Sequence, residues 1–523
     1  MATLTQLKKL VQENELLKKE LDKMVRENTH HLRTIEVLEE EIRVLHQRFF
    51  ARRSEKWPQD EQKQAYLFDE AEVAASEQEI DACEEEPTEQ KKPRNKKSGR
   101  KPLPKSLVRE EFIHDIDEAQ KICSCGCMKT VIGHEVSEKL EIIPAQLKVQ
   151  RHIRLKYACS CCKDETKGPT VIVAPNSPQI LPKTMATPGL LAYVIASKYA
   201  DGIPLNRQER LFARIGIDLP RETLGRWIMK VASKVEPLIE VFTQKIRSYP
   251  ALLLDETTLQ VMNEIGKENT TTSYMWVARG GPPESPVVRF SYSPSRASAV
   301  AEKLLESYQG FVQTDGYAGY DKPCSVQGIT HVSCFAHARR KFYEAQKASK
   351  KSGQALEALS YIKKLYKAET QARAASSSAT DFVEKRKALV QPVFDSFHQW
   401  LLKKEQTVLS SSTLGKAVAY TLGQWEKLIR YVDSPNLTPD TNRVENAIRP
   451  FVVGRKNWML QGSPRGAFSS AVLYSILETA KANNLEPYWY LRFLLTQLEK
   501  NMDTPDWEAL APWSLTKEQI EQP

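Results

Sequence analysis

Three acidic residues lie where the chain could hold them rigidly. Asp255 closes the apolar run 251–254, Asp315 closes a second strand-like run, and Glu445 lies further on in a polar stretch. A carboxylate at the end of a buried strand is fixed in position, and three such groups can hold one or two divalent metal ions. Enzymes that displace a group at a phosphodiester commonly use this arrangement. We therefore predict that the three residues act together as ligands of catalytic metal ions.

Other reactive side chains lie close to these acids in the sequence. Arg449 follows Glu445 by four residues, so on a helix it would share that face and could hold the carboxylate or a phosphate. Cys334 and His337 have zinc-ligand spacing, but two ligands do not make a zinc site. We predict that His337 lies near the catalytic metals and polarises a phosphate or leaving group. The alternative is a buried, packed pair of Cys334 and His337.

Cysteine usage indicates a second kind of metal site. Six of the nine cysteines fall into two clusters, at 123–127 and 159–162. In a cytosolic chain such clusters favour metal ligation over disulfides. The first pair is one residue tighter than the usual C-x2-C spacing, so Cys127 or Cys161 could substitute as a ligand, and a set of free thiols is the alternative. The structural zinc ligands that we expect are Cys123, Cys125, Cys159 and Cys162.

Length and charge set limits on the class of protein. A chain of 523 residues is expected to form three or more domains. It has no run of about eighteen apolar residues and no apolar signal segment at its start, so we expect a cytoplasmic, nucleoid-associated protein. The net charge is +9. Residues 69–90 contain ten acidic and no basic side chains, and residues 91–105 contain eight basic and no acidic ones. The basic block suggests contact with a polyanion, and a solvated linker that binds nothing is the alternative.

The first fifty residues keep one heptad register from 4 to 48. Nine of the twelve a and d positions are apolar, and Asn14 and Asn28 occupy two a positions. Sustained heptads predict a coiled coil, and Asn at position a favours a parallel dimer. A helix folded back on its own protein is the alternative. Beyond the linker, Arg100 and Lys101 form part of a basic arm that could lie in a minor groove of DNA.

The middle of the chain has two further patterns. Residues 148–157 largely alternate apolar and basic side chains, so one face of a strand could pack while the other contacts phosphate. Residues 205–215 and the stretch from Arg221 are two helices separated by a Gly-containing turn, which is helix-turn-helix spacing. A plain helical hairpin is the alternative. The candidates for the exposed side of the second helix are Arg221, Thr223 and Arg226.

Residues 250–335 change to strand signals. We expect strands at 252–254, 274–278 and 287–292, a helix at 297–308, and strands at 311–314 and 331–335. Three strands, a helix and two more strands, with Asp at the ends of the first and fourth, is an RNase H-like order. The next hundred residues are predicted to be a helical insertion, with an Ala/Ser connection at 374–379.

The fold class that we expect is multidomain α+β. An RNase H-like α/β catalytic core with a helical insertion is preceded by a coiled coil, a zinc-knuckle unit and a helical DNA-binding region. The predicted boundaries are 1–57 for the coiled coil, 58–109 for the charged linker, 110–182 for the Cys-rich domain, 183–248 for the helix-turn-helix-like region, 249–336 for the first part of the core, 337–440 for the insertion, 441–485 for the last part of the core and 486–523 for a helical C-terminal segment.

Ordered motifs along nearly the whole chain resemble the bacterial insertion-sequence transposases of the insertion sequence 66 family. The blocks include Leu254-Asp255-Glu256-Thr257, Thr314-Asp315-Gly316-Tyr317, Cys334-Phe335-Ala336-His337, Asn442-Arg443-Val444-Glu445 and Gly454-Arg455-Lys456-Asn457. The shortened first Cys pair departs from the family pattern at Cys123.

This resemblance implies a DDE triad at Asp255, Asp315 and Glu445, with two Mg²⁺ ions (or Mn²⁺) as cofactors. It also implies cleavage at element ends and joining of the freed 3′-OH to target DNA. Partners would be double-stranded DNA, a second copy of the chain through the coiled coil, and accessory proteins encoded by the element. Together the DNA-contact candidates are Arg100, Lys101, Arg221, Thr223, Arg226, Arg339, Arg340, Arg449, Arg455 and Lys456.

Two other functions would use the same features. One is a zinc-dependent DNA-binding regulator with a vestigial core, and metal-dependent nicking of an end-bearing duplex would separate it from a transposase. The other is a nuclease without strand transfer, which the absence of joined products would reveal. A glycosidase with paired carboxylates is disfavoured by the basic flanks and the Cys clusters.

Overall fold

The computed structural model describes residues 147–158, 171–175, 178–348, 353–501 and 503–521, together with helical residues scattered between Asn14 and Arg43. The predicted zinc ligands, Arg100 and Lys101 lie outside the described residues. The chain divides into two compact units, one formed by residues 1–84 and 178–523 and the other by residues 85–177. In the part that is described, none of the helices is long and apolar enough to cross a membrane.

The described residues of the N-terminal stretch are helical, as the heptads predict. Apolar side chains at the a and d positions are solvent-exposed there, with Leu21 at 62%, Met24 at 65% and Ile42 at 64%. A helix stabilised only by its own hydrogen bonds gains nothing from apolar residues in water. The pairing of this helix into a coiled coil stays a prediction.

The smaller unit contains one described ribbon of two strands. Strand β1 (Lys156–Ala158) pairs antiparallel with β2 (Val171–Val173). The strand predicted at 148–157 is therefore wrong over most of its length, because residues 147–155 have no strand structure. Its apolar side chains are also exposed, with Val149 at 95%. Among the described residues of this unit no second layer buries one face of the ribbon, so the alternating pattern does not correspond to a packed strand there.

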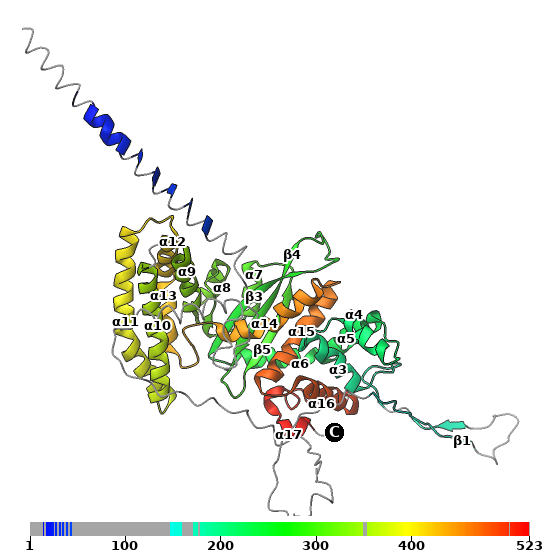
Figure 1. Ribbon diagram of the computed structural model, residues 1–523. Coiled ribbons are helices and arrows are strands. Elements are labelled where there is room, and N and C mark those ends of the chain that lie inside the picture. The colour runs from blue at the N-terminus through cyan, green and yellow to red at the C-terminus, as the bar shows by residue number, and fades with distance from the viewer. Residues whose placement is uncertain are drawn as a thin grey trace, which may run out of the picture. The chain divides into compact units, whose positions relative to one another are not determined.

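A five-stranded mixed sheet forms the centre of the larger unit (Figure 1). Its strand order is β5-β4-β3-β6-β7, in which β3, β4 and β5 are antiparallel neighbours and β3, β6 and β7 are parallel. Helix α7 (Ser298–Leu304) lies between β5 and β6 in the chain, so the expected succession of three strands, a helix and two strands is confirmed. The strands are β3 (Ala251–Gln260), β4 (Thr272–Gly280), β5 (Val287–Ser293), β6 (Gly310–Gln313) and β7 (Ile329–Val332).

Strand β3 continues past the residue that was expected to end it. Its first four residues, Ala251–Leu254, are at most 4% exposed, as suits a central strand covered on both faces. Asp255 lies in the middle of the strand because pairing with β4 carries β3 on to Gln260. Pairing with β6 stops earlier, at Leu253 opposite Gln313. The prediction that Asp255 ends a strand is therefore wrong, because β3 continues to Gln260. The parallel pairing of β3 with β6, however, does end two residues before Asp255.

Helix α15 (Pro464–Ala482) covers the outer strand of the sheet (Figure 1). Ser475 Oγ accepts a hydrogen bond from the N–H of Phe290 at 2.8 Å, and Thr479 Oγ1 accepts one from Val288 at 3.0 Å. These hydroxyls satisfy N–H groups of β5 that have no neighbouring strand. Helix α14 (Asn442–Trp458) packs beside it against β3 and β4.

Four helices precede the sheet: α3 (Pro188–Tyr199), α4 (Leu205–Arg214), α5 (Arg221–Val235) and α6 (Pro237–Arg247). Gly216 lies between α4 and α5 with φ at +81°, a conformation that favours glycine and ends α4. On α5, Leu224 and Ile228 are buried, whereas Arg221 and Arg226 are exposed and Thr223 is half-buried. Two of the three residues expected on the exposed side of the second helix, Arg221 and Arg226, are therefore exposed, and their contact with DNA stays a prediction.

The described chain between β7 and α14 is mostly helical, with short connections such as 408–412 and a loop at 434–441. Its apolar side chains form a second core around Phe335, Phe394 and Phe397. Residues 376–378 connect two long helices, as expected. The fifth predicted strand is shorter than expected, because Phe335 starts a helix. These elements are α9 (Phe335–Ala348), α10 (Gly353–Ala375), α11 (Ala379–Thr407), α12 (Thr413–Gly423), α13 (Trp425–Leu428) and η4 (Ile429–Asp433).

The remaining elements are short or terminal. A 3-10 turn, η3 (Ala318–Tyr320), and α8 (Asp321–Cys324) connect β6 to β7. The chain ends with α16 (Pro487–Lys500), η5 (Pro512–Ser514) and α17 (Lys517–Ile520). The start of a helix near Pro487 is as expected, although α17 follows it. The proposed domain boundaries stay predictions.

Candidate active site and metal centre

Both aspartates follow the end of the parallel pairing between β3 and β6. Residues of β3 pair with residues of β6 at a constant offset of 60, the last pair being Leu253 and Gln313. Asp255 and Asp315 each follow that pair by two residues, Asp255 still within β3 and Asp315 in the loop after β6. The two aspartates therefore come from neighbouring strands, just past the point where these strands stop pairing.

Local hydrogen bonds fix both aspartates. Asp255 Oδ1 accepts a hydrogen bond from the N–H of Glu256 at 2.8 Å. Asp315 Oδ1 accepts one from the N–H of Tyr317 at 2.9 Å, which forms a tight Asx turn. The hydroxyl of Tyr420 on α12 donates to the carbonyl oxygen of Asp315 at 2.9 Å. The helical segment after β7 thus helps to position the second aspartate.

Glu445 comes from the first turn of α14 and joins the same region. Burial raises the pKa of the Asp255 carboxyl well above its usual value, and the nearby charges of Glu445, Glu256 and Asp315 raise that pKa further. Thr441 Oγ1 donates to Glu445 Oε1 at 3.0 Å and holds the side chain from its own helix start. The charges of Glu445 and Asp315 therefore act on Asp255, but among the described residues the three acids do not form a group whose ligand atoms all lie within 4.8 Å of one another. Their joint action as metal ligands stays a prediction.

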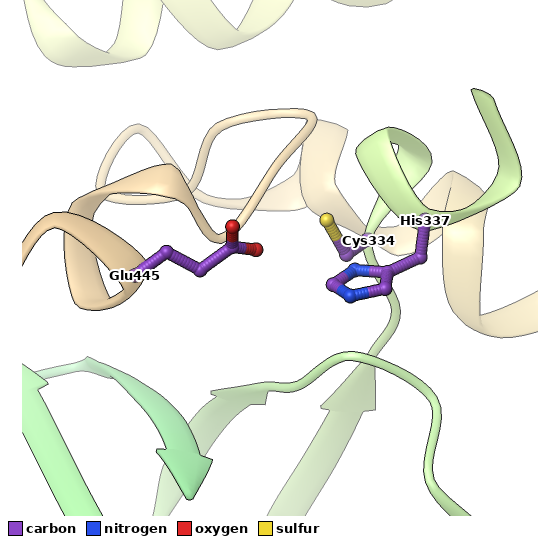
Figure 2. Close-up of side chains that lie close together, drawn as sticks. All are labelled: Cys334, His337 and Glu445. Carbon is purple, nitrogen blue, oxygen red and sulfur yellow. The ribbon is translucent and has the colours of Figure 1, made fainter. Parts of the chain in front are cut away.

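Glu445 also lies beside the Cys–His pair (Figure 2). One ligand atom from each of Cys334, His337 and Glu445 lies within 4.8 Å of the others. The buried Cys334 Sγ accepts a hydrogen bond from the backbone N–H of Thr441 at 3.3 Å and lies 3.2 Å from the Thr441 hydroxyl, whose single proton it shares with Glu445. Burial, followed by the charges of Glu445 and Asp440, raises the pKa of the Cys334 thiol to about 12.

An ion-paired glutamate next to Asp255 was not predicted as part of the site. The Glu256 side chain is 2% exposed and lies 2.5 Å from Nη2 of Arg296. The Arg296 guanidinium also lies over the ring of Tyr317, 3.7 Å from its centroid, and the hydroxyl of Tyr320 donates to Glu256. This network connects the residue after Asp255 to the loop after Asp315. In the sequence, only the position of Glu256 next to Asp255, and of Tyr317 two residues after Asp315, could have indicated this network.

The predicted DNA contacts lie at several places in the larger unit. Arg221 forms an exposed ion pair with Glu222, and Arg226 donates to Thr223 at 3.0 Å. Arg339 and Arg340 are half-buried on α9. Contacts of these residues with DNA stay predictions.

The basic residues of α14 differ in their surroundings. Arg449 is half-buried and Lys456 is exposed. Arg455 donates to the hydroxyls of Thr257 at 3.3 Å and Thr258 at 2.9 Å, and burial lowers the pKa of its guanidinium. Arg455 therefore joins α14 to β3, and a contact of this side chain with DNA also stays a prediction.

Family comparisons assign most of the chain. Residues 183–469 match a model described as "Transposase IS66 family", and residues 475–513 match the "IS66 C-terminal element". Residues 120–163 match the "zinc-finger binding domain of transposase IS66", a range that contains every predicted zinc ligand. Residues 37–112 match a model described as "Transposase C of IS166 homeodomain".

Similar proteins occur in Sinorhizobium fredii (strain NBRC 101917 / NGR234). The uncharacterized protein y4jD is 34% identical over 434 residues, which cover 80% of this chain and 83% of the relative. The uncharacterized protein y4qI is 30% identical over 448 residues, covering 82% and 81% respectively. One family model spans more than half of the chain, and these relatives align along most of their length. The chain belongs to the IS66 family of transposases.

Proposed function

We propose that this protein is a DDE-type DNA transposase. It cuts DNA at the ends of an insertion sequence and joins the freed 3′-OH to target DNA, with Asp255, Asp315 and Glu445 as its catalytic carboxylates. The observation that carries the proposal is the environment of Asp255, whose carboxyl feels the charges of both other acids. These residues are 60 and 130 positions apart (315 − 255 and 445 − 315), so only the fold could bring them into one metal site.

The sheet supports an RNase H-like core. In the order β5-β4-β3-β6-β7, the strands β5, β4 and β3 are antiparallel neighbours, and β6 and β7 continue the sheet from β3 as parallel strands. The two aspartates follow the point where β3 and β6 stop pairing. Glu445 is supplied by α14, which packs on β3 and β4. Strand β3 and the end of β6 therefore provide a rigid base for two of the carboxylates, and α14 adds the third.

Magnesium or manganese fits this set of carboxylates. Both ions prefer oxygen ligands, and three mutually repelling carboxylates have the charge to hold them. Two bound ions would stabilise charge on the attacking and leaving oxygens of an in-line displacement. Around them, Tyr317 and Tyr420 hold Asp315 in place while Thr441 orients Glu445. The expected role of His337 is to approach the phosphate or leaving group from the first turn of α9.

The other parts of the chain suit DNA handling. The range that matches the zinc-finger model would hold a structural zinc ion with four of its cysteines. Exposed Arg221 and Arg226 place basic groups on one side of α5. The heptads would pair two copies of the chain, as holding two DNA ends requires. Accessory proteins encoded by the element and a cytoplasmic, nucleoid-associated location belong to the same proposal.

Cleavage of a labelled duplex bearing an element end tests the proposal. Asp255→Asn, Asp315→Asn and Glu445→Gln should each abolish Mg²⁺-dependent cleavage and retain end binding. Glu306→Gln, which changes an exposed acid just after α7, is the matched control and should cleave like the parent. Cleavage by Asp315→Asn at the parent rate would refute the triad. Cleavage without joined products would indicate a nuclease instead.

A further inference from the structure

We propose that Cys334, His337 and Glu445 form a binding site for Zn²⁺ or a similar thiophilic divalent cation, separate from the Cys clusters near the N-terminus. The three ligand atoms lie within 4.8 Å of one another (Figure 2). Zinc bonds of about 2.0–2.3 Å in tetrahedral geometry separate neighbouring ligand atoms by roughly 3.3–3.8 Å. Small side-chain rotations are therefore enough to close the three groups around an ion.

The ligand chemistry distinguishes this site from a carboxylate site for magnesium. Thiolate sulfur and imidazole nitrogen suit Zn²⁺, whereas Mg²⁺ prefers oxygen. A site of three mixed protein ligands keeps a fourth position open, as catalytic zinc sites do and closed structural sites do not. Ion binding would replace the thiol proton of Cys334 with a sulfur–zinc bond, and the proton would leave to solvent.

Two independent features of the side chains indicate a ligand. His337 Nδ1 is buried and has no hydrogen-bond partner among the described residues. Buried imidazole nitrogens normally find a partner, so this nitrogen is available to an ion. Cys334 Sγ, by contrast, accepts a hydrogen bond from the backbone N–H of Thr441 and lies 3.2 Å from its hydroxyl. Hydrogen-bond donors at sulfur oppose the effect of burial, and a bound cation would compensate the remaining cost of forming the thiolate.

The backbone holds the two halves of the site against each other. Cys334 and His337 lie at the start of α9, and Glu445 lies in the first turn of α14. The N–H of Phe335 donates to the carbonyl of Pro439 at 2.8 Å, which joins the two helix starts directly. The loop between η4 and α14 is held by Arg386, whose guanidinium donates to the carbonyl oxygens of Ser434 at 2.6 Å and Leu437 at 3.1 Å. These hydrogen bonds hold the three ligand residues near one another before an ion binds.

Titration of the full-length protein with Co²⁺ tests the proposal. Co²⁺ is a spectroscopic substitute for zinc, and a bond between cobalt and thiolate gives a charge-transfer absorption band. The parent should bind one more Co²⁺ per chain than Cys334→Ser, with a matching loss of band intensity in the variant. Cys324→Ser changes the other described free cysteine, which is also buried, and should behave like the parent. His337→Gln changes a half-buried residue and should weaken the binding of this additional Co²⁺ at least about 10-fold.

Equal Co²⁺ uptake and equal band intensity in the parent, Cys334→Ser and His337→Gln would overturn the site. Circular dichroism of each variant detects loss of folding, and the milder His337→Gln decides the matter if Cys334→Ser unfolds. Asp255→Asn separates this proposal from the transposase proposal. It should lose Mg²⁺-dependent cleavage and still bind the additional Co²⁺. Normal cleavage by Asp255→Asn would refute the triad without affecting the metal measurement.

Discussion

Glu478→Gln should stabilise the protein, and more so at high pH. Glu478 lies on α15 with a side chain that is 6% exposed, 2.6 Å from the ammonium group of Lys481. Burial raises its pKa from 4.5 to about 7, although Lys481 and Arg279 oppose the rise. The folded protein therefore binds a proton at Glu478 that the unfolded chain releases. The stability from this group is present below pH 4.5 and is lost as pH rises towards 7.

The magnitude follows from the two pKa values. Ionisation with a pKa of 4.5 in the unfolded chain and about 7 in the folded protein costs about 1 kcal/mol of stability at pH 5 and about 3 kcal/mol at pH 8. Glutamine has nearly the same shape and never ionises, so the substitution removes this cost. It also removes the ion pair with the partly exposed Lys481, a loss of about 0.5 kcal/mol. The net gain should be about 2 kcal/mol larger at pH 8 than at pH 5.

Hydrogen exchange of peptides from α15, measured on the full chain, provides the assay. At pH 8 the variant should exchange roughly 10- to 100-fold more slowly than the parent, and at pH 5 the difference should nearly disappear. Glu405→Gln, which changes an exposed acid on α11, is the control and should leave exchange in α15 unaltered. Faster exchange in Glu478→Gln at pH 8, or an equal effect at both pH values, would refute the reasoning.

Three further substitutions test how the site is supported. Arg296→Met leaves Glu256 buried without its cation, so urea unfolding should show a loss of about 2–4 kcal/mol and cleavage should fall more than end binding; an unchanged urea midpoint would contradict this. Thr479→Val removes the partner of the Val288 N–H at the outer strand and should cost about 1–3 kcal/mol in the same measurement, whereas Thr479→Ser should retain most of the stability. Asp255→Asn relieves repulsion among three acids, so its melting temperature at pH 8 without metal should exceed that of the parent, and a lower value would argue that the acids are not close.

The sequence located the sheet because strand signals are mostly local. Apolar runs and their order along the chain predicted five strands around a helix, and the structure has that succession. The place of Asp255 within β3 could not be predicted in the same way. Residues 256–260 are largely polar, and pairing with β4 holds them in the sheet. Such pairing depends on tertiary context, which overrides local propensity.

Candidate residues were likewise easier to identify than their contacts. Asp255, Asp315 and Glu445 stood out because each lies in a distinctive stretch of sequence. Glu256 did not, because nothing in its neighbourhood shows that Arg296 will pair with it from the far end of β5. An acidic residue next to a candidate is usually solvated, and its burial becomes evident only when the partner is in place.

The cluster of Cys334, His337 and Glu445 could not be predicted from residue spacing alone. The spacing of Cys334 and His337 indicates one helical turn with two ligands, and a third ligand has to come from elsewhere in the fold. Glu445 arrives 111 residues after Cys334 (445 − 334) because Arg386 on α11 holds the carbonyls of the loop that leads into α14. An arginine in a charged helix is normally expected at the surface, yet this side chain is fully buried. The helices between β7 and α14 therefore do more than separate Asp315 from Glu445, because α11 holds the loop that leads Glu445 to the Cys–His pair.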